Sequence, residues 1–139
     1  MTTVGYSGTP LLKKLGIKDD TKVLLRNPPD NYFELLEQDI SPQLCKKSDL
    51  PGLVHVFAAS NKIFEKEMAA LQPIWKKNTG VTIWISWYKK SSGMASDLTE
   101  DIIRNYALAN GLVDVKVCAV SDLWSGLKLV VPLIKRNKK

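Results

Sequence analysis

Apolar residues in the second half of the chain are grouped in a pattern that predicts a strand, a helix and a strand. Residues 53–59 and 81–87 are nearly continuous apolar runs with polar flanks, which is typical of buried strands. From Asn61 to about Lys77 the apolar residues have helical spacing, and Ser60 is of a type that caps helix N-termini. This order predicts a βαβ unit, with both strands parallel in one sheet and the helix packed across it.

Four segments are predicted before this unit: a short helix over 10–15, a strand over 21–26, a helix over 32–38 and a polar connection over 39–52. Thr9 and Pro10 suit the start of the first helix, because proline fits the first helical position. The pair Pro28-Pro29 ends the first strand, since proline has no N–H to donate to a neighbouring strand.

The C-terminal third predicts a loop, a helix and two strands. Residues 88–96 are polar, and Asp97-Leu98-Thr99-Glu100 has the pattern of a capping box that opens a helix to about Asn110. Strands are predicted over 113–120 and 127–133, and the connection over 121–126 is short enough to require an antiparallel pair.

Together these elements predict an α/β fold, as a single Rossmann-like domain over residues 1–139. We expect three layers: a mostly parallel five-stranded sheet with one antiparallel C-terminal strand, and helices on both faces. With 139 residues, of which 45% are hydrophobic and 24% charged, the chain can build one core without disulfides or metals.

The charge and the hydropathy of the chain limit which partners and which compartment we expect for the protein. The net charge is +6, and the basic residues gather near the end, at Lys128, Lys135, Arg136, Lys138 and Lys139. We expect residues 135–139 to be a disordered basic tail. Nucleic acid stays a weak alternative, because aromatic residues do not alternate with basic ones as a stacking surface requires. The start lacks a signal-peptide pattern and no run of 18 apolar residues occurs, which predicts a cytoplasmic protein without a membrane span.

Several common chemistries lack their residues. Cys45 and Cys118 form no C-x-x-C pair, which favours reduced thiols over zinc or a disulfide. The single histidine, His55, alternates with Leu53 and Phe57 on one strand face, so we expect a buried, hydrogen-bonded histidine. The patterns G-x-S-x-G, H-E-x-x-H and the P-loop are missing. We therefore expect no metal and no cofactor, and the sequence identifies no catalytic residue.

The strongest candidate site lies at the carboxyl edge of the predicted sheet, where loops leaving parallel strands converge. Three loops should meet there: 27–30, 89–93 and 121–126. The run Lys89-Lys90-Ser91-Ser92-Gly93, with the helix start at Asp97 and Thr99 behind it, offers ammonium groups, hydroxyls and backbone N–H groups to an anion. The alternative is a solvated loop whose lysines serve solubility.

The residues expected to line the rest of this site are Asn27, Trp87, Trp124, Ser125 and Lys128. Trp84 and Trp87 lie three apart in one strand and so point to opposite sheet faces, with Trp84 expected in the core. Trp124, placed in a turn, either closes the end of the core or covers a pocket, and we favour the first. Capping is the favoured role of Asp97, Glu100 and Asp101, over acid–base chemistry.

Several longer motifs support a family resemblance: Gly5-Tyr6-Ser7-Gly8-Thr9-Pro10-Leu11, Lys13-Lys14-Leu15-Gly16, Trp87-x-Lys89-Lys90, Asp97-x-Thr99-Glu100-Asp101, Val115-Lys116-Val117-Cys118-Ala119-Val120 and Trp124-Ser125-Gly126-Leu127-Lys128. On these the chain resembles a bacterial family of short proteins, the domain of unknown function numbered three thousand and fifty-two. The resemblance spans nearly the whole chain and implies no activity.

The order of elements also looks like the carboxyl half of class I S-adenosylmethionine-dependent methyltransferases. Those enzymes follow their first strand with an acidic residue and a glycine-rich turn, whereas Arg26-Asn27-Pro28-Pro29 stands here. Prolines offer the cofactor neither close backbone approach nor N–H donors. The resemblance therefore implies a truncated methyltransferase-like fold that lacks the cofactor loop.

Three functions follow as hypotheses. The first is a non-catalytic binding or interaction module that holds a small anionic ligand or an acidic protein segment at the carboxyl edge. The second is an enzyme of unassigned class from a methyltransferase-like ancestor, with Lys89 or Asp97 in acid–base chemistry. The third is a weak nucleic-acid binder. The sequence leaves the ligand and the oligomeric state open.

Overall fold

The structure is a computed structural model and describes residues 10–46 and 49–132. The expected cap Thr9 and the expected tail 135–139 lie outside these residues. The described strands are β1 (Val23–Arg26), β2 (Leu53–Phe57), β3 (Thr82–Tyr88), β4 (Val113–Ala119) and β5 (Trp124–Val130). The described helices are α1 (Leu11–Leu15), α2 (Tyr32–Leu36), α3 (Asn61–Lys77) and α4 (Glu100–Ala109), with 3₁₀ turns η1 (Ser41–Gln43) and η2 (Lys90–Ser92).

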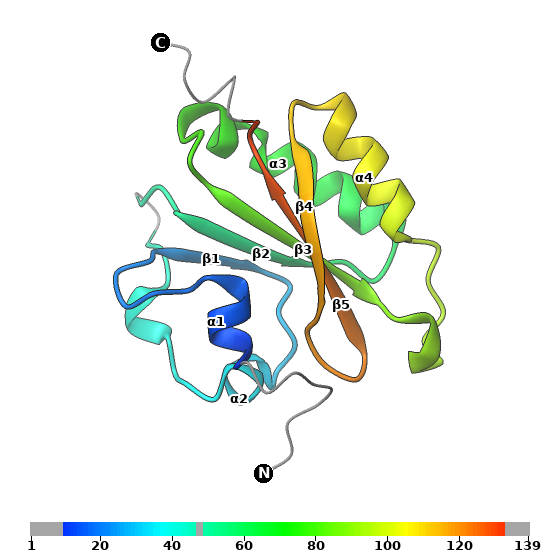
Figure 1. The fold of residues 1–139 in the computed structure, drawn as a ribbon, viewed down its shortest axis with the longest axis horizontal. Helices are drawn as coiled ribbons and strands as arrows, with labels where there is room; N and C mark the ends of the chain where they lie inside the picture. The colour runs from blue at the N-terminus through cyan, green and yellow to red at the C-terminus, as the bar shows by residue number, and fades with distance from the viewer. Residues whose placement is uncertain (1–9, 47–48, 133–139) are drawn as a thin grey trace.

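The five strands form one mixed sheet in the order β1-β2-β3-β5-β4 (Figure 1). β1, β2 and β3 are parallel neighbours, whereas β5 is antiparallel to both β3 and β4. The predicted βαβ unit is confirmed as β2-α3-β3, and so is the antiparallel pairing of the last two strands. The carboxyl ends of β1, β2, β3 and β4 therefore lie at the same edge of the sheet.

Helices contact both faces of this sheet, with unequal cover. The long helices α3 and α4 lie across one face, and the short helices α1 and α2 lie at the other (Figure 1). Phe64 and Met68 of α3 pack with Ile83 and Ile85 of β3, while Trp84 between them packs on the α1 side. The arrangement is thus an α/β domain, less regular than the three layers expected, because α1 and α2 have only five residues each.

The connection over 39–52, which the sequence left open, is tied to the first strand. Ile40 is fully buried, and Leu44 forms an isolated parallel bridge with Val23 of β1. The side-chain amide of Gln43 donates to the carbonyl oxygens of Lys18 and Thr21, at 2.6 and 3.0 Å. The segment therefore follows β1 and closes the core on the α1 and α2 face.

The last strand begins earlier than predicted. It runs from Trp124 to Val130, where the sequence predicts 127–133, so Trp124 and Ser125 belong to the strand and four residues, 120–123, connect it to β4. Ser121 allows this because its hydroxyl accepts from the N–H groups of Leu123 and Trp124. Glycine at position 126 lets the Val120 and Trp84 side chains pack closely on the strand, since a Cβ there would meet them at 3.1 and 3.3 Å.

The predicted capping box at Asp97 is wrong. Helix α4 begins at Glu100, and its cap is Thr99, whose hydroxyl accepts from the Ile102 N–H at 3.3 Å. The Asp97 carboxylate instead accepts from the backbone N–H of Asn61, at 2.8 Å. Asp97 thus caps the first turn of α3 from a distant segment. Ser60 caps the same helix, which confirms the prediction.

Candidate functional site

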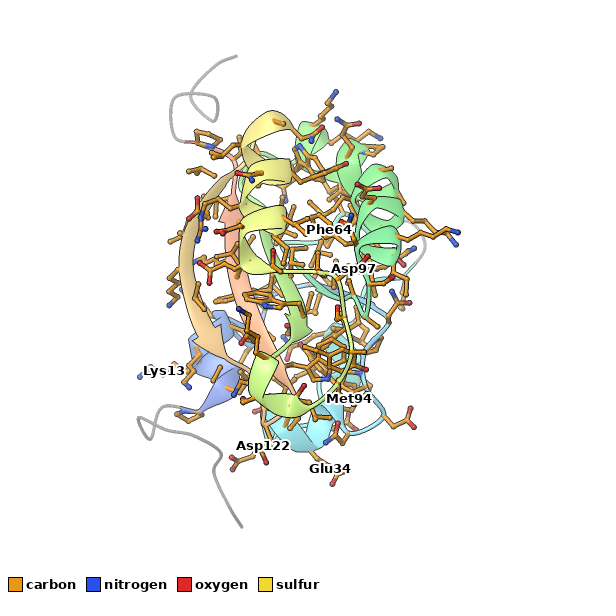
Figure 2. All side chains as sticks on the ribbon, turned by 90° about the vertical axis from the view of Figure 1, so that its right-hand side faces the viewer. Lys13, Glu34, Phe64, Met94, Asp97 and Asp122 are labelled. Atoms are coloured by element: carbon orange, nitrogen blue, oxygen red, sulfur yellow. The ribbon has the colours of Figure 1, made fainter. Side chains whose placement is uncertain are left out.

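An open pocket of about 900 Å³ lies at the carboxyl end of β3, between the loop that follows this strand and the first turn of α4. Residues from β3, the loop, α4 and β5 line it: Trp87, Tyr88, Lys89, Lys90, Ser91, Met94, Ala95, Ser96, Leu98, Thr99, Glu100, Asp101 and Ser125. Figure 2 shows Met94 on this loop and Asp97 in the segment that leads to α4, on the side where α3 lies. The pocket is therefore at the sheet edge that the sequence indicated.

The floor of the pocket follows from strand alternation. Trp87 belongs to the apolar cluster on the α3 and α4 face, and its neighbour Tyr88 belongs to the opposite cluster. Tyr88 stacks on Trp124 with ring centroids 4.2 Å apart. Ser125, which pairs with Trp87 across the two strands, shares the pocket face. The prediction that Trp84 and Trp87 point to opposite faces is confirmed, and Trp84 lies in the core.

The loop over residues 89–93, called the lysine loop below, is held in place by hydrogen bonds. The N–H of Lys89 donates to the carbonyl oxygen of Leu123 in the β4–β5 turn, at 2.8 Å. The Ser92 hydroxyl donates to the Lys89 carbonyl at 2.6 Å and accepts from the Met94 N–H at 3.1 Å. Gly93 then takes a left-handed conformation, with φ of 78°, that other residues rarely adopt. The loop thus presents Lys89, Lys90 and Ser91 from a defined turn.

The opposite wall is the N-terminus of α4, which carries both free donors and carboxylates. Within residues 10–46 and 49–132, no acceptor is bonded to the backbone N–H groups of Glu100 and Asp101. Their carboxylates both accept from Arg104, which also donates to Asp114 of β4 at 3.0 Å. These hydrogen bonds to Glu100 and Asp114 raise the pKa of the Arg104 guanidinium.

The electrostatics of the two walls differ. Lys89 and Lys90 make no ion pair with any residue that the structure places, whereas Glu100 and Asp101 share Arg104. The helix N-terminus adds a partial positive charge to its wall. The uncommitted charges of the pocket are therefore the two ammonium groups, and an anion is the ligand that they and the free N–H groups favour.

Six of the predicted site residues are brought together in the pocket: Trp87, Lys89, Lys90, Ser91, Thr99 and Ser125. Ser92 and Asp97 lie in the same segment, but their side chains are engaged in the loop turn and at the start of α3. The sequence indicated this group because Trp87 ends a predicted strand and Lys89, Lys90, Ser91 and Thr99 follow it in one short stretch.

The other predicted residues lie elsewhere, so the three loops do not share one pocket. Asn27, in a left-handed conformation after β1, donates to Phe57 O and to the carboxylate of Glu67 on α3, which also binds Arg26 at 2.7 Å. Trp124 is buried against Phe57 and Tyr88 and closes the core, as favoured. Lys128 lies between Leu127 and Leu129 of β5 and so points to the face opposite the pocket.

The sequence missed the apolar part of the wall. Met94, Ala95 and Leu98 line the pocket, and Met94 keeps 47% of its surface exposed. A methionine in a polar, serine-rich loop was the available signal, because an exposed thioether is costly unless something packs on it. Glu100 and Asp101 also line the pocket, whereas the sequence favours only a helix-capping role for them.

The described part of the chain shows no cluster of three or more histidine, cysteine or acidic side chains that a metal ion could occupy. None of the described helices combines the length and the apolar composition needed to cross a membrane.

Two solved bacterial structures are similar to this chain. One is a protein in the NADB-Rossmann superfamily from Streptococcus agalactiae, with a TM-score of 0.54 and 9% identity over 94% of this chain and 71% of that one. The other is an uncharacterised protein from Listeria monocytogenes serotype 4b, with a TM-score of 0.57 and 7% identity over 91% and 69%. No protein-family model and no curated protein sequence matches. These likenesses show a Rossmann-like fold and leave the ligand open.

Proposed function

We propose that this protein is a binding module whose β3–α4 pocket holds an anionic group, either on a small molecule or on an acidic protein segment. One observation carries the proposal. Lys89 and Lys90 line the same pocket as the first turn of α4, which has free backbone N–H groups. Neither lysine has an ion-pair partner among the described residues. Backbone N–H groups at a helix start and unpaired ammonium groups are the donors that phosphates and carboxylates bind.

A thermal-shift panel tests this proposal. It contains sugar phosphates, nucleotides, S-adenosylmethionine and a glutamate-rich peptide. A ligand present at a hundredfold its Kd stabilises the folded state by about 2.7 kcal/mol, which raises the unfolding midpoint by several degrees. The double variant Lys89→Ala/Lys90→Ala should lose this shift, because it removes both unpaired charges from the pocket.

The matched control is Lys76→Ala/Lys77→Ala, which removes two adjacent exposed lysines from the last turn of α3, outside the pocket. The control should keep the shift. A panel without any shift, or a shift that both double variants lose equally, would overturn the proposal. In the second case the affinity should also fall steeply with salt, as for non-specific nucleic-acid binding.

The methyltransferase-like ancestry is a second, structural part of the proposal. Two consecutive βα units followed by the antiparallel pair β4–β5 support a truncated methyltransferase-like fold, and the family resemblance concerns the same elements. The catalytic alternative receives less support, because Asp97, one of its two acid–base candidates, is hydrogen-bonded to the start of α3.

A further inference from the structure

The indole N–H of Trp87 is a donor that the fold leaves unused. Trp87 is only 8% exposed and lines the pocket floor, yet no hydrogen-bond acceptor for it occurs in the described part of the chain. Among the described residues, Asn61 Oδ1 is the one side-chain polar atom that is both fully buried and without a hydrogen-bond partner. The Trp87 N–H, which also lacks a partner, is therefore accessible to solvent. By contrast, the Trp84 indole donates to the Leu15 carbonyl at 2.9 Å.

Because the Trp87 N–H reaches solvent, either water or a ligand in the pocket can accept from it. Tyrosine and tryptophan N–H and O–H groups normally find a partner when they are buried. Trp87 lines the same pocket as Lys89 and Lys90, whose ammonium groups have no ion-pair partner among the described residues, and as the first turn of α4 with its free N–H groups. All these groups donate, and an oxyanion supplies several acceptor positions at once.

Part of the pocket lining is apolar. Met94, Ala95 and Leu98 line it between the lysine loop and α4, and the Met94 thioether is flexible enough to pack on groups of different shape. A bare ion such as inorganic phosphate would leave this surface wet. An apolar group attached to the oxyanion would cover it.

Resting on the proposed anion site, we propose that the ligand is an oxyanion with an apolar substituent, bound so that the Trp87 N–H donates to the oxyanion. Trp87 is the most buried side-chain donor of the lining, Lys89 and Lys90 balance the charge, and Met94, Ala95 and Leu98 cover the substituent. Carboxylates and phosphate monoesters share this chemistry, and the probes below distinguish the two.

Nuclear magnetic resonance of the tryptophan indole N–H groups tests this assignment in the unmodified protein. The four tryptophans give four signals, and Trp87→Phe identifies one by its loss while keeping an aromatic ring. Phenyl phosphate or benzoate should move the Trp87 signal saturably and leave the Trp84 signal in place. Phenyl phosphate should bind about tenfold or more tightly than inorganic phosphate, since the ring buries apolar surface.

Affinity measurements on variants complete the test. Trp87→Phe should weaken phenyl phosphate binding by about tenfold or more, the effect of losing one hydrogen bond to a charged group. Trp84→Phe is the matched control: it loses an indole N–H on the opposite sheet face and should keep the affinity. The wild-type Trp87 signal tests the assignment independently of whether either variant folds well.

The outcomes separate this inference from the proposed function. If an anion binds in a Lys89- and Lys90-dependent way while the Trp87 signal stays still, the assignment of Trp87 is overturned and the anion site stands. If inorganic phosphate binds as tightly as phenyl phosphate, the apolar substituent is overturned. If benzylamine moves the Trp87 signal and no anion does, the acidic side chains select a cation, and both proposals fail. Absence of binding by every probe also overturns both.

Discussion

At the scale of single residues, His55 shows how a lone polar side chain is accommodated in this core. It is fully buried on β2, with Nδ1 hydrogen-bonded to the Tyr32 hydroxyl and Nε2 to the Ser86 hydroxyl, both at 2.8 Å. Its ring stacks on Phe57. A neutral imidazole has one N–H and one acceptor nitrogen, so two hydroxyls satisfy it completely. The expectation of a hydrogen-bonded core histidine is confirmed.

This burial predicts a pH dependence of stability. Burial lowers the pKa of His55 to about 3, well below the ordinary histidine value of about 6.5. The unfolded chain therefore binds more protons between these values, and the free energy of unfolding falls as the pH drops below 6.5, by at most about 1.4 kcal/mol per pH unit. Urea unfolding at pH 7.5, 6.5 and 5.5 measures the slope.

The variant His55→Gln provides the comparison, because this is the only histidine in the chain. Carboxylates remain largely ionised above pH 5.5, so the variant should lose most of the slope between pH 6.5 and 5.5. A wild-type stability that stays constant over this interval would contradict the prediction.

At the scale of elements, side chains from distant segments hold the helices in place. Asp97 binds the start of α3, and Arg104 of α4 binds Asp114 on β4. β4 is irregular between Asp114 and Lys116, which pair with Leu129 and Lys128, on opposite faces of the sheet. This bulge turns Asp114 toward α4, so the irregularity of the edge strand is what makes the ion pair possible.

Asp97→Ala should therefore destabilise the protein through α3 and not through α4. It removes an acceptor from the Asn61 N–H and a negative charge from a helix N-terminus, which together cost about 0.5–2 kcal/mol. Asp122→Ala, at an exposed position in the β4–β5 turn, is the matched control and should change stability by less than about 0.5 kcal/mol. Denaturant unfolding measures both, and equal effects would count against the role of Asp97.

At the scale of the whole molecule, one sheet separates two apolar clusters. Ile83 belongs to the cluster under α3 and α4, whereas Ile40, just before η1, belongs to the cluster under α1 and α2. Adjacent residues of β2 and β3 contribute to both clusters alternately, so the sheet couples them. We expect the described domain to unfold as one cooperative unit.

Two single-methyl deletions test this expectation. Ile83→Val and Ile40→Val each remove a methyl group from a fully buried side chain and should each cost about 0.5–1.5 kcal/mol. Circular dichroism and tryptophan fluorescence should report the same shifted midpoint for each variant. Two separate transitions, with Ile40→Val moving only one, would show that the α1 and α2 side unfolds independently.

Periodicity along the chain was enough to predict the order of the elements, the parallel βαβ unit, the opposite faces of Trp84 and Trp87, and a polar lysine loop at the carboxyl edge. These features depend on periodicity and on residues close together in the chain, which propensity and strand alternation decide locally. The same reasoning placed Lys89, Lys90, Ser91 and Thr99 in one segment, and the structure brings these four together in the pocket.

Which distant segments contact one another could be read only from the folded molecule. The partners of Asp97 and Asn27 lie 36 and 40 residues away, so no local pattern reveals that these side chains are already engaged. The side chains that pack closely on Gly126, Val120 and Trp84, come from the preceding turn and from β3. The pocket itself forms where Met94 and Leu98 fold back beside Trp87, because contacts between distant segments depend on packing that periodicity does not encode.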